Sequence, residues 1–333
     1  MSGSVRIVNK GIQALVEDWP GRTGYYKFGY SISGAADHLA HRLANLLVGN
    51  KPGEAGLEIA GGMLVAQFES DTMIAITGAN LQPSINDEPA SMWRSIPVKE
   101  GDVIRFMFPK DFGFRAYLAF GGGIDVPEFF GSRSTCIYGR YGGFQGRPLE
   151  AGDTLKIGRV AHPSSKRRRV RPESIPRHDR TWEVRMVPGP TCAPEYVTEE
   201  GMDRVYSGAF RVDRNADRSG YRLVTPHEIF PDSWARETGG VAGKHSSNIV
   251  DMGYTLPGGL NVSGDQIIVL GPDGPCGGGF VTIGMVLYAD VWKVFQAIPG
   301  KDSIKFVHAT IEEAEASRKV TEDRLSAAVV EEE

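Results

Sequence analysis

Glycine and proline interrupt this chain at short intervals, and that punctuation limits the folds open to it more than any other feature. The 333 residues include 42 glycines and 20 prolines, which leave little room for long helices. Between the turns lie runs that are typical of strands: Met73 to Ala79, Asp102 to Phe108, Arg115 to Gly123 and Gln266 to Gly274. The pattern predicts a mainly β chain with a few short helices.

One local pattern recurs along the sequence. The segments that begin at Ile96 (IPVKEGDVIRF), Arg147 (RPLEAGDTLKI) and Ile298 (IPGKDSIKF) each contain a proline, a polar turn that ends in Asp, and then alternating apolar residues. A tight turn that leads into a half-buried strand has this pattern, so we interpret these segments as corners of β-barrels. Such units occur in any β-barrel and indicate no particular activity.

Helical patterns are sparse. The segment from Ser33 to Leu47 has Ser33 as the expected N-cap and a shared apolar face formed by Leu39, Leu43, Leu46 and Leu47. A second helix is expected over Asp290 to Ile298. The segment from Ile311 to Leu325 is charged and only weakly periodic.

A basic stretch that contains several prolines divides the sequence. We predict a linker at 161–180, an N-terminal β-barrel domain at 1–160, a C-terminal one at 181–310 and a charged, frayed tail at 311–333. Deletion of Ser164 to Arg169 is therefore expected to leave the fold intact. The alternative is an arm that binds nucleic acid, but no aromatic residues interleave the basic ones.

Charge and hydropathy exclude several classes of function. The 37 basic and 41 acidic side chains give a net charge of −4, so no general positive field attracts nucleic acid. The N-terminus lacks the pattern of a signal peptide, and no apolar run approaches the ~20 residues that span a bilayer. The three cysteines are widely spaced and form no CxxC motif, which argues against a disulfide framework or a zinc ribbon; they are Cys136, Cys192 and Cys276. We expect a cytoplasmic protein that binds neither nucleic acid nor membranes.

Polar, glycine-rich stretches are the candidate site, because they expose backbone and gather hydrogen-bonding side chains. They are Asp18 to Gly24, Gly131 to Arg147, Asp213 to Arg222, and a region that runs from His245 to Gly279 and ends in GPDGPCGGG. The last loop lacks the spacing and the lysine of a phosphate-binding loop. Its N–H groups could form a nest for a polarised carbonyl oxygen, and the alternative is a stack of turns that needs positive φ.

Two further chemistries have little support. Cys276 could act as a nucleophile, but no base can be assigned to it, so we interpret it as a small side chain in a tight turn. His38 and His41 share a helix face without an acidic or Cys ligand set, and we interpret them as surface histidines rather than metal ligands.

Taken in order, several stretches resemble the biotin-dependent carboxyltransferase family, also called allophanate hydrolase subunit 2. These are GIQALVEDWPGRTGYYKFGYSISGAADHLAHRLANLLVGN, GSRST, GGFQGRPLEAGD, DRSGYRL, HSSN and GDQIIVLGPDGPCGGGFV. Within the family, HSSN and GPDGPCGGGFV resemble the carboxyltransferase region of urea carboxylase more than the shorter versions found in a 5-oxoprolinase subunit. The resemblance implies two cyclophilin-like β-barrel domains and a cytoplasmic protein that pairs with a subunit-1 partner.

The same resemblance implies roles for individual residues. N–H groups at Gly277, Gly278 and Gly279 would stabilise negative charge on the ureido oxygen of biotin. Arg140 or Arg218 would hold the migrating carboxylate, and Asp217 or Asp273 would orient the substrate and help to remove its proton. The remaining polar candidates would bind substrate or biotin: Ser132, Arg133, Ser134, Gln145, His245 and Asn248.

We therefore expect a carboxyltransferase subunit that acts on a urea-like or related amide and holds no metal. Biotin would be carried on another chain or domain, and ATP would be used only at a partner subunit, so the partners would include biotin carboxylase, a biotin carrier and the subunit-1 protein. One alternative is a subunit of an ATP-dependent 5-oxoprolinase. Another is a non-catalytic binding module that sequesters a kinase-inhibitor protein.

Overall fold

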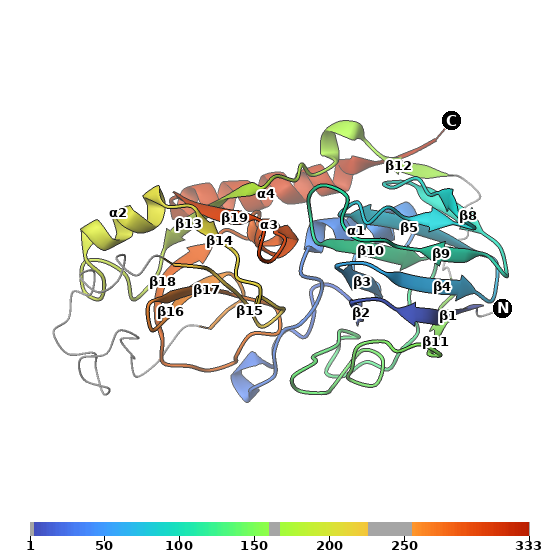
Figure 1. Cartoon of the computed structure of the whole chain (residues 1–333), viewed down its shortest axis with the longest axis horizontal. Helices are drawn as coiled ribbons and strands as arrows, with labels where there is room; N and C mark the ends of the chain where they lie inside the picture. Colours follow the sequence, from blue (N-terminus) through green and yellow to red (C-terminus); the bar gives the residue numbers. More distant parts are fainter. Residues whose placement is uncertain (1–2, 160–166, 226–254, 333) are drawn as a thin grey trace. The chain divides into compact units, whose positions relative to one another are not determined.

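The computed structural model (Figure 1) describes residues 3–159, 167–225 and 255–332. The chain divides into two compact units. The first contains Met1–Tyr25, Ile32–His178 and Glu322–Glu333, and the second contains Tyr26–Ser31 and Asp179–Thr321. Each unit thus contains a short piece from a distant part of the sequence.

Two antiparallel sheets form the first unit. One has the order β11-β1-β4-β9-β6-β7 and the other β2-β3-β10-β5-β8. Their strands are β1 (Gly3–Lys10), β2 (Gln13–Glu17), β3 (Gly56–Ala60), β4 (Leu64–Phe68), β5 (Thr72–Gly78), β6 (Ser84–Ile85), β7 (Glu88–Pro89), β8 (Ser95–Val98), β9 (Val103–Arg105), β10 (Arg115–Phe120) and β11 (Thr154–Ile157).

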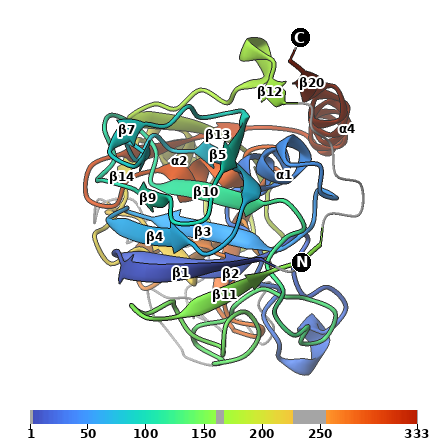
Figure 2. The ribbon, with the colours of Figure 1, turned by 90° about the vertical axis from the view of Figure 1, so that its right-hand side faces the viewer.

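Alternation along β5 and β10 explains how the first unit is layered. Ile74 and Ile76 belong to the main core, whereas Ala75 between them packs in the second core beside α1 (His38–Leu47). On β10, Leu118 belongs to the main core and Tyr117 to the second core. Successive side chains of a strand point to opposite faces, so this sheet is apolar on both sides and α1 covers one of them (Figure 2).

The helix α1 begins later than the sequence predicts. Its N-cap is Asp37, whose side chain accepts a hydrogen bond from Ala40 N at 2.9 Å, so the assignment of Ser33 as the cap is wrong. Ser33 has a φ of 55°, and Gly34 after it also has a positive φ, so the backbone there is left-handed and cannot open a helix. Both His38 and His41 are buried, which corrects their assignment as surface histidines.

The second unit contains a seven-stranded sheet of order β14-β19-β13-β18-β16-β17-β15, in which β13 and β19 run parallel. Helix α3 (Val291–Gln296) follows Asp290 as expected, whereas α2 (Glu199–Ser207), capped by Thr198, was not predicted. The strands are β13 (Thr181–Pro188), β14 (Phe210–Arg211), β15 (Gly220–Arg222), β16 (Gly259–Ser263), β17 (Gln266–Leu270), β18 (Val281–Val286) and β19 (Ser303–His308).

The predicted tail is folded rather than frayed. Helix α4 (Ile311–Ala328) leads into β20 (Val329–Glu331), which pairs antiparallel with β12 (Arg168–Val170) from the expected linker. The backbone N–H of Arg168 also donates to the hydroxyl oxygen of Ser95, at 2.8 Å. Residues 168–170 are therefore part of a small sheet, and the prediction of a wholly solvated linker is wrong for them.

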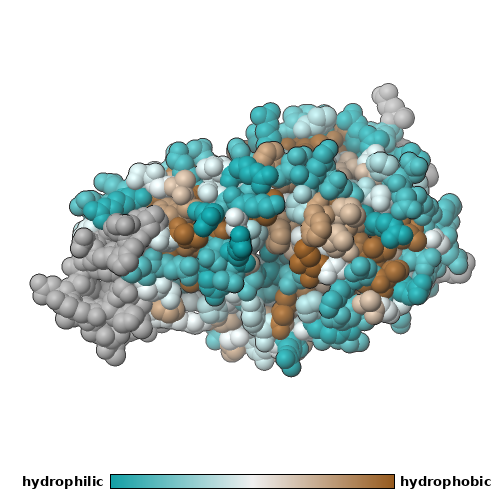
Figure 3. All heavy atoms as spheres, in the orientation of Figure 1, coloured by the Kyte–Doolittle hydropathy of each residue, from teal (hydrophilic) through white to brown (hydrophobic). Residues whose placement is uncertain are grey.

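The predicted fold class, mainly β with few helices, is confirmed by this arrangement. In the part of the chain that the structure describes, no helix has the length and apolar character to cross a membrane. On the face drawn in Figure 3, hydrophilic side chains cover most of the surface, with smaller apolar areas between them.

Candidate functional site

In the first unit, two of the predicted loops meet at the carboxylate of Asp18. This residue follows β2 and is buried, and its two oxygens accept hydrogen bonds from Ser132 Oγ at 2.9 Å and from the N–H of Arg133 at 2.6 Å. The hydroxyl of Ser134 donates to the same carboxylate and accepts from Asp18 N. The structure thus brings Ser132, Arg133 and Ser134 together, with both serine hydroxyls engaged by a buried charge.

Arg22 lies at the centre of the same pair of loops, and residue type alone did not single it out. Its side chain is fully buried and donates to the carbonyl oxygens of Phe129 at 3.0 Å and Ser134 at 2.8 Å. Its guanidinium also lies over the ring of Tyr141, 4.7 Å from the centroid. These surroundings indicate that Arg22 fixes the shape of the Gly131–Arg147 loop.

Arg140 and Gln145 occupy a different part of this loop. Both are exposed, with φ values of 54° and 59°, and Gln145 Oε1 accepts a hydrogen bond from Arg147 at 3.1 Å. Arg147 in turn lowers the pKa of Asp153 through a close ion pair. No ion pair holds Arg140 within the described residues, so its guanidinium is open to a ligand.

In the second unit, Arg218 and Asp273 form an ion pair. Arg218 Nε lies 2.8 Å from Asp273 Oδ2, its Nη2 lies 3.3 Å from Oδ1, and both side chains are almost fully buried. From the family resemblance, Arg218 is expected to hold a carboxylate and Asp273 to orient the substrate and help to remove its proton. The structure instead places them against each other, so each neutralises its partner's charge.

Asp217 is next to this pair but is held separately. Its Oδ1 accepts hydrogen bonds from the N–H of Ser219 at 2.8 Å and from its hydroxyl at 2.6 Å. The carbonyl oxygen of Ser219 accepts the N–H of Gly271 at 3.0 Å, which joins this turn to the start of the glycine-rich loop. No Cβ fits at Gly271, because it would collide with the carbonyl of Arg218.

The later part of the glycine-rich loop is open. Gly277 and Gly278 are exposed and Gly279 is half-buried, and none has a positive φ, so the alternative of a turn stack that needs positive φ is wrong for them. Among the described residues, a Cβ on Gly277 would meet no atom within 4 Å, and one on Gly278 would meet only Thr255, at 3.2 Å. Within the described residues, the N–H groups of Cys276, Gly277 and Gly278 have no acceptor.

A short segment from the N-terminal part of the chain holds this loop. Tyr26 Oη lies 2.7 Å from the carbonyl oxygen of Pro275 and 2.6 Å from that of Thr255. Ser31 Oγ donates to the carbonyl oxygen of Gly274 at 2.9 Å. Burial raises the pKa of the Tyr26 phenol, so the group stays a protonated donor at neutral pH. No local sequence signal pointed to either contact.

Two predicted residues, His245 and Asn248, lie outside the described residues.

Burial lowers the pKa of His41 to about 4, so this histidine is neutral near pH 7. Among the residues that the structure describes, no group of His, Cys, Asp and Glu side chains could hold a metal ion.

Comparison with known proteins agrees with the resemblance seen in the sequence. The family described as "carboxyltransferase domain, subdomain A and B" matches residues 28–308. A urea amidolyase of Lachancea kluyveri is 37% identical over 310 residues, which is 90% of this chain and 17% of that protein. A 5-oxoprolinase subunit of Escherichia coli is 34% identical over 321 residues, which is 95% of this chain and 94% of that protein.

A solved structure shows the same relationship in three dimensions. The crystal structure of the Kluyveromyces lactis urea carboxylase matches 97% of this chain with a TM-score of 0.88 and 33% identity, over 29% of its own length. The chain therefore spans less than a third of the fungal enzyme and nearly all of the bacterial protein. The chain belongs to the family of carboxyltransferase domains, subdomains A and B.

Proposed function

We propose that this chain moves a carboxyl group from carboxybiotin, carried on another chain or domain, to a urea-like or related amide. The observation that carries the proposal is the open glycine-rich loop, whose N–H groups at Cys276, Gly277 and Gly278 have no acceptor within the described residues. The relationship to urea carboxylase supports the reaction class. This chain covers a fraction of that enzyme, so the other activities would lie on other chains or domains.

The donors of the loop fit the ring of biotin. Backbone N–H groups suit a ureido oxygen, and no described residue lies within 4 Å of a Cβ on Gly277, so a ring can approach the backbone closely there. When bound, biotin supplies the carboxyl group that is transferred. The loop N–H groups would then stabilise negative charge on the ureido oxygen, as preorganised donors do in other transfer reactions.

The side chains Tyr26 and Ser31 support these donors without touching the substrate. In a trans peptide the C=O and the N–H point in opposite directions. Because Tyr26 holds the carbonyl oxygen of Pro275, the N–H of Cys276 is turned away from Tyr26. We therefore assign the N–H of Cys276, together with that of Gly277, as the main donor pair.

The remaining predicted residues divide by their surroundings. Arg140 is the better candidate to hold the migrating carboxylate, because Arg218 is occupied by Asp273. Asp217 is the better candidate for a base, since it is only half-buried whereas Asp273 is buried against a guanidinium. The residues around Asp18 support the loop that carries Arg140: Ser132, Arg133 and Ser134.

The proposal is tested by reconstitution. This chain is combined with a subunit-1 protein, a biotinylated carrier and biotin carboxylase, and ADP release is measured with ATP, bicarbonate and urea or a simple amide. Release that depends on the amide and on this chain supports the proposal. Its absence with every amide, despite a functional carboxylase and a fully biotinylated carrier, overturns it.

A matched pair of variants tests the loop itself. Gly277→Val should abolish transfer, because its side chain fills the space beside the donors, yet it should leave the fold intact because no described residue lies within 4 Å of the added Cβ. Cys276→Ser keeps the same N–H and should retain most activity. One such donor typically contributes a factor of about 10²–10³ to the rate, so a side chain that blocks access to the donors should lower the rate by at least that factor. If Gly277→Val is active and Cys276→Ser inactive, the thiol rather than the backbone carries the reaction.

A second candidate function is that of a 5-oxoprolinase component. The observation that favours it is the 34% identity with the Escherichia coli 5-oxoprolinase subunit over 95% of this chain. In the same reconstitution, cleavage of 5-oxoproline that needs ATP and a subunit-1 partner but no biotin would establish this alternative. A chain that binds its partner tightly but supports neither reaction would instead be the binding module.

A further inference from the structure

The first unit contains a cavity of about 750 Å³ that the proposed transfer does not use. It is lined by residues that follow β5, by the turn around β6 and β7, and by the segments Lys110–Phe112 and Pro176–His178. All of these belong to the same unit. Pockets of about 300–1,000 Å³ are typical of sites for small molecules, so the size alone admits such a ligand.

The walls of this cavity are held by backbone hydrogen bonds. Trp93 N donates to the carbonyl oxygen of Ile76 at 2.8 Å, and Lys110 N donates to that of Asn80 at 3.1 Å. Trp93 and Gln82 both have positive φ, at 63° and 48°, a conformation that side chains of this size rarely adopt. Such backbone strain clusters at ligand sites, where the surrounding structure maintains it.

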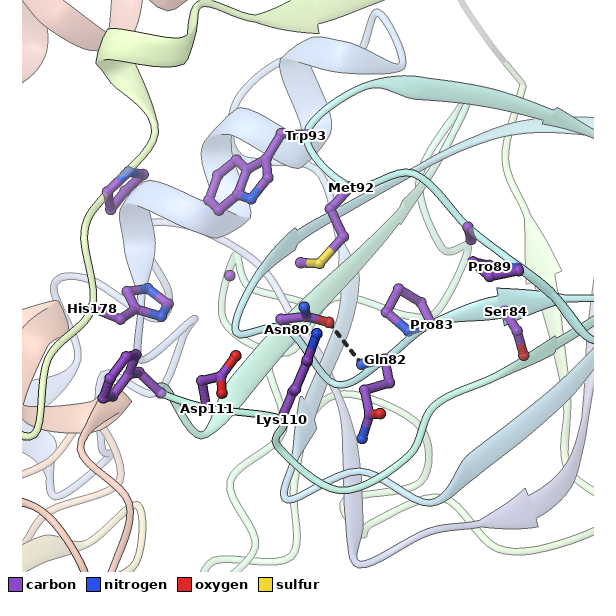
Figure 4. A pocket seen from close by; sticks show the side chains of 14 residues that line it. Asn80, Gln82, Pro83, Ser84, Pro89, Met92, Trp93, Lys110, Asp111 and His178 are labelled. Atoms are coloured by element: carbon purple, nitrogen blue, oxygen red, sulfur yellow. Dashed lines mark hydrogen bonds between the residues drawn. The ribbon is translucent and has the colours of Figure 1, made fainter.

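The side chains of the cavity divide into an apolar part and a charged part. Met92 and Trp93 form an apolar wall, and Phe112 also lines the cavity. Figure 4 shows the ammonium of Lys110 beside Asn80, and the carboxylate of Asp111 on the side of His178. Neither Lys110 nor Asp111 forms an ion pair with any residue that the structure describes.

We propose that this cavity binds a free α-amino acid with an apolar side chain. Lys110 and the amide of Asn80 receive its carboxylate, Asp111 receives its ammonium group, and Met92 and Trp93 pack against its side chain. A small zwitterion matches this cavity best, because the cavity has one positive and one negative side chain, Lys110 and Asp111, beside an apolar wall. A ligand with only negative charge would be repelled by Asp111, and an uncharged apolar ligand would desolvate both charges without compensation.

Calorimetric titration of the full chain with phenylalanine, leucine and methionine tests the proposal without any partner component, so its outcome is independent of the transfer reaction. We expect saturable binding, and weaker binding of the N-acetyl and amide derivatives, each of which lacks one of the two charges. Lys110→Met and Asp111→Asn should each weaken binding by about tenfold to a hundredfold, the usual effect of a lost charged hydrogen bond. Both residues are exposed, so both variants should fold.

Lys51→Met is the matched control, since Lys51 is an exposed lysine of the same unit outside the cavity. It should bind the amino acids as the unchanged chain does. The proposal is overturned if none of the three amino acids binds at millimolar concentration. It is also overturned if the N-acetyl derivatives bind equally well, or if both cavity variants keep full affinity.

Discussion

Replacement of Arg218 by methionine tests whether the buried ion pair is structural or catalytic. The side chains of Arg218 and Asp273 are 1% and 0% exposed, and the guanidinium makes two contacts with the carboxylate. Arg218→Met keeps the bulk of the chain but leaves the Asp273 charge buried without its partner. Breaking such a pair from one side costs about 3–5 kcal/mol, a large part of the stability of a typical domain.

Urea denaturation followed by circular dichroism measures this loss. Arg211→Met, at an exposed arginine of β14 in the same unit, is the control and should change the free energy of unfolding by less than about 0.5 kcal/mol. The double variant Arg218→Met with Asp273→Asn should recover part of the loss, because the uncompensated charge is then removed.

The outcome separates two roles for the same arginine. If Arg218→Met has the stability of the unchanged chain but transfers no carboxyl group in the reconstituted system, then Arg218 holds substrate and our structural interpretation of the pair is refuted. If stability falls as expected and the double variant restores both stability and activity, the charges are not needed for transfer.

Three further predictions use other contacts. Tyr26→Phe removes the donor to the carbonyl oxygens of Pro275 and Thr255, and should lower the transfer rate while circular dichroism shows an intact fold; an unchanged rate would contradict its positioning role. The pKa of His41 is about 4 in the folded chain and 6.5 in its ordinary state, so between these values the unfolded chain binds a proton that the folded chain does not. The free energy of unfolding should therefore fall by about 2 kcal/mol from pH 7 to pH 5. Urea titrations of His41→Gln should show a smaller fall. Deletion of Ser164–Arg169 removes two residues of β12 and should destabilise the chain by about 1–3 kcal/mol, against the neutral effect that composition predicts; equal melting curves would show that the β12–β20 pairing adds little.

Local patterns in the sequence predict the positions of four strands that the structure contains: β5, β9, β10 and β17. In β5 and β10 the alternation of side chains is a property of neighbouring residues, so a short window contains it. The N-cap of α1 was misplaced because Ser33 and Asp37 are both good caps by residue type. Only the backbone conformation, left-handed at Ser33, distinguishes them.

Pairings between segments far apart in the sequence produce no local pattern that predicts them. Strand β12 pairs with β20 across a long stretch of sequence, and each is only three residues long, so neither shows a periodic pattern. The same limit applies to the candidate site. Residue type alone makes Arg218 and Asp273 candidates, but their pairing across 55 positions depends on the fold. Glycine positions indicated the loop, and no residue type pointed to Tyr26.

The contacts at the candidate site favour backbone N–H groups over buried side chains as the groups that act on the substrate. The buried carboxylates of Asp18 and Asp273 are each satisfied by hydrogen bonds inside their own unit, so they have fewer lone pairs to offer a substrate. The glycine-rich loop shows the opposite arrangement. Its carbonyl oxygens at Gly274 and Pro275 are held by Ser31 and Tyr26, while its N–H groups at Cys276, Gly277 and Gly278 have no acceptor among the described residues. Backbone N–H groups do not titrate in the physiological range, so their contribution to transfer should be constant with pH. Asp217→Asn, which replaces the proposed base, should therefore lower the transfer rate strongly, whereas Cys276→Ser should leave it nearly unchanged.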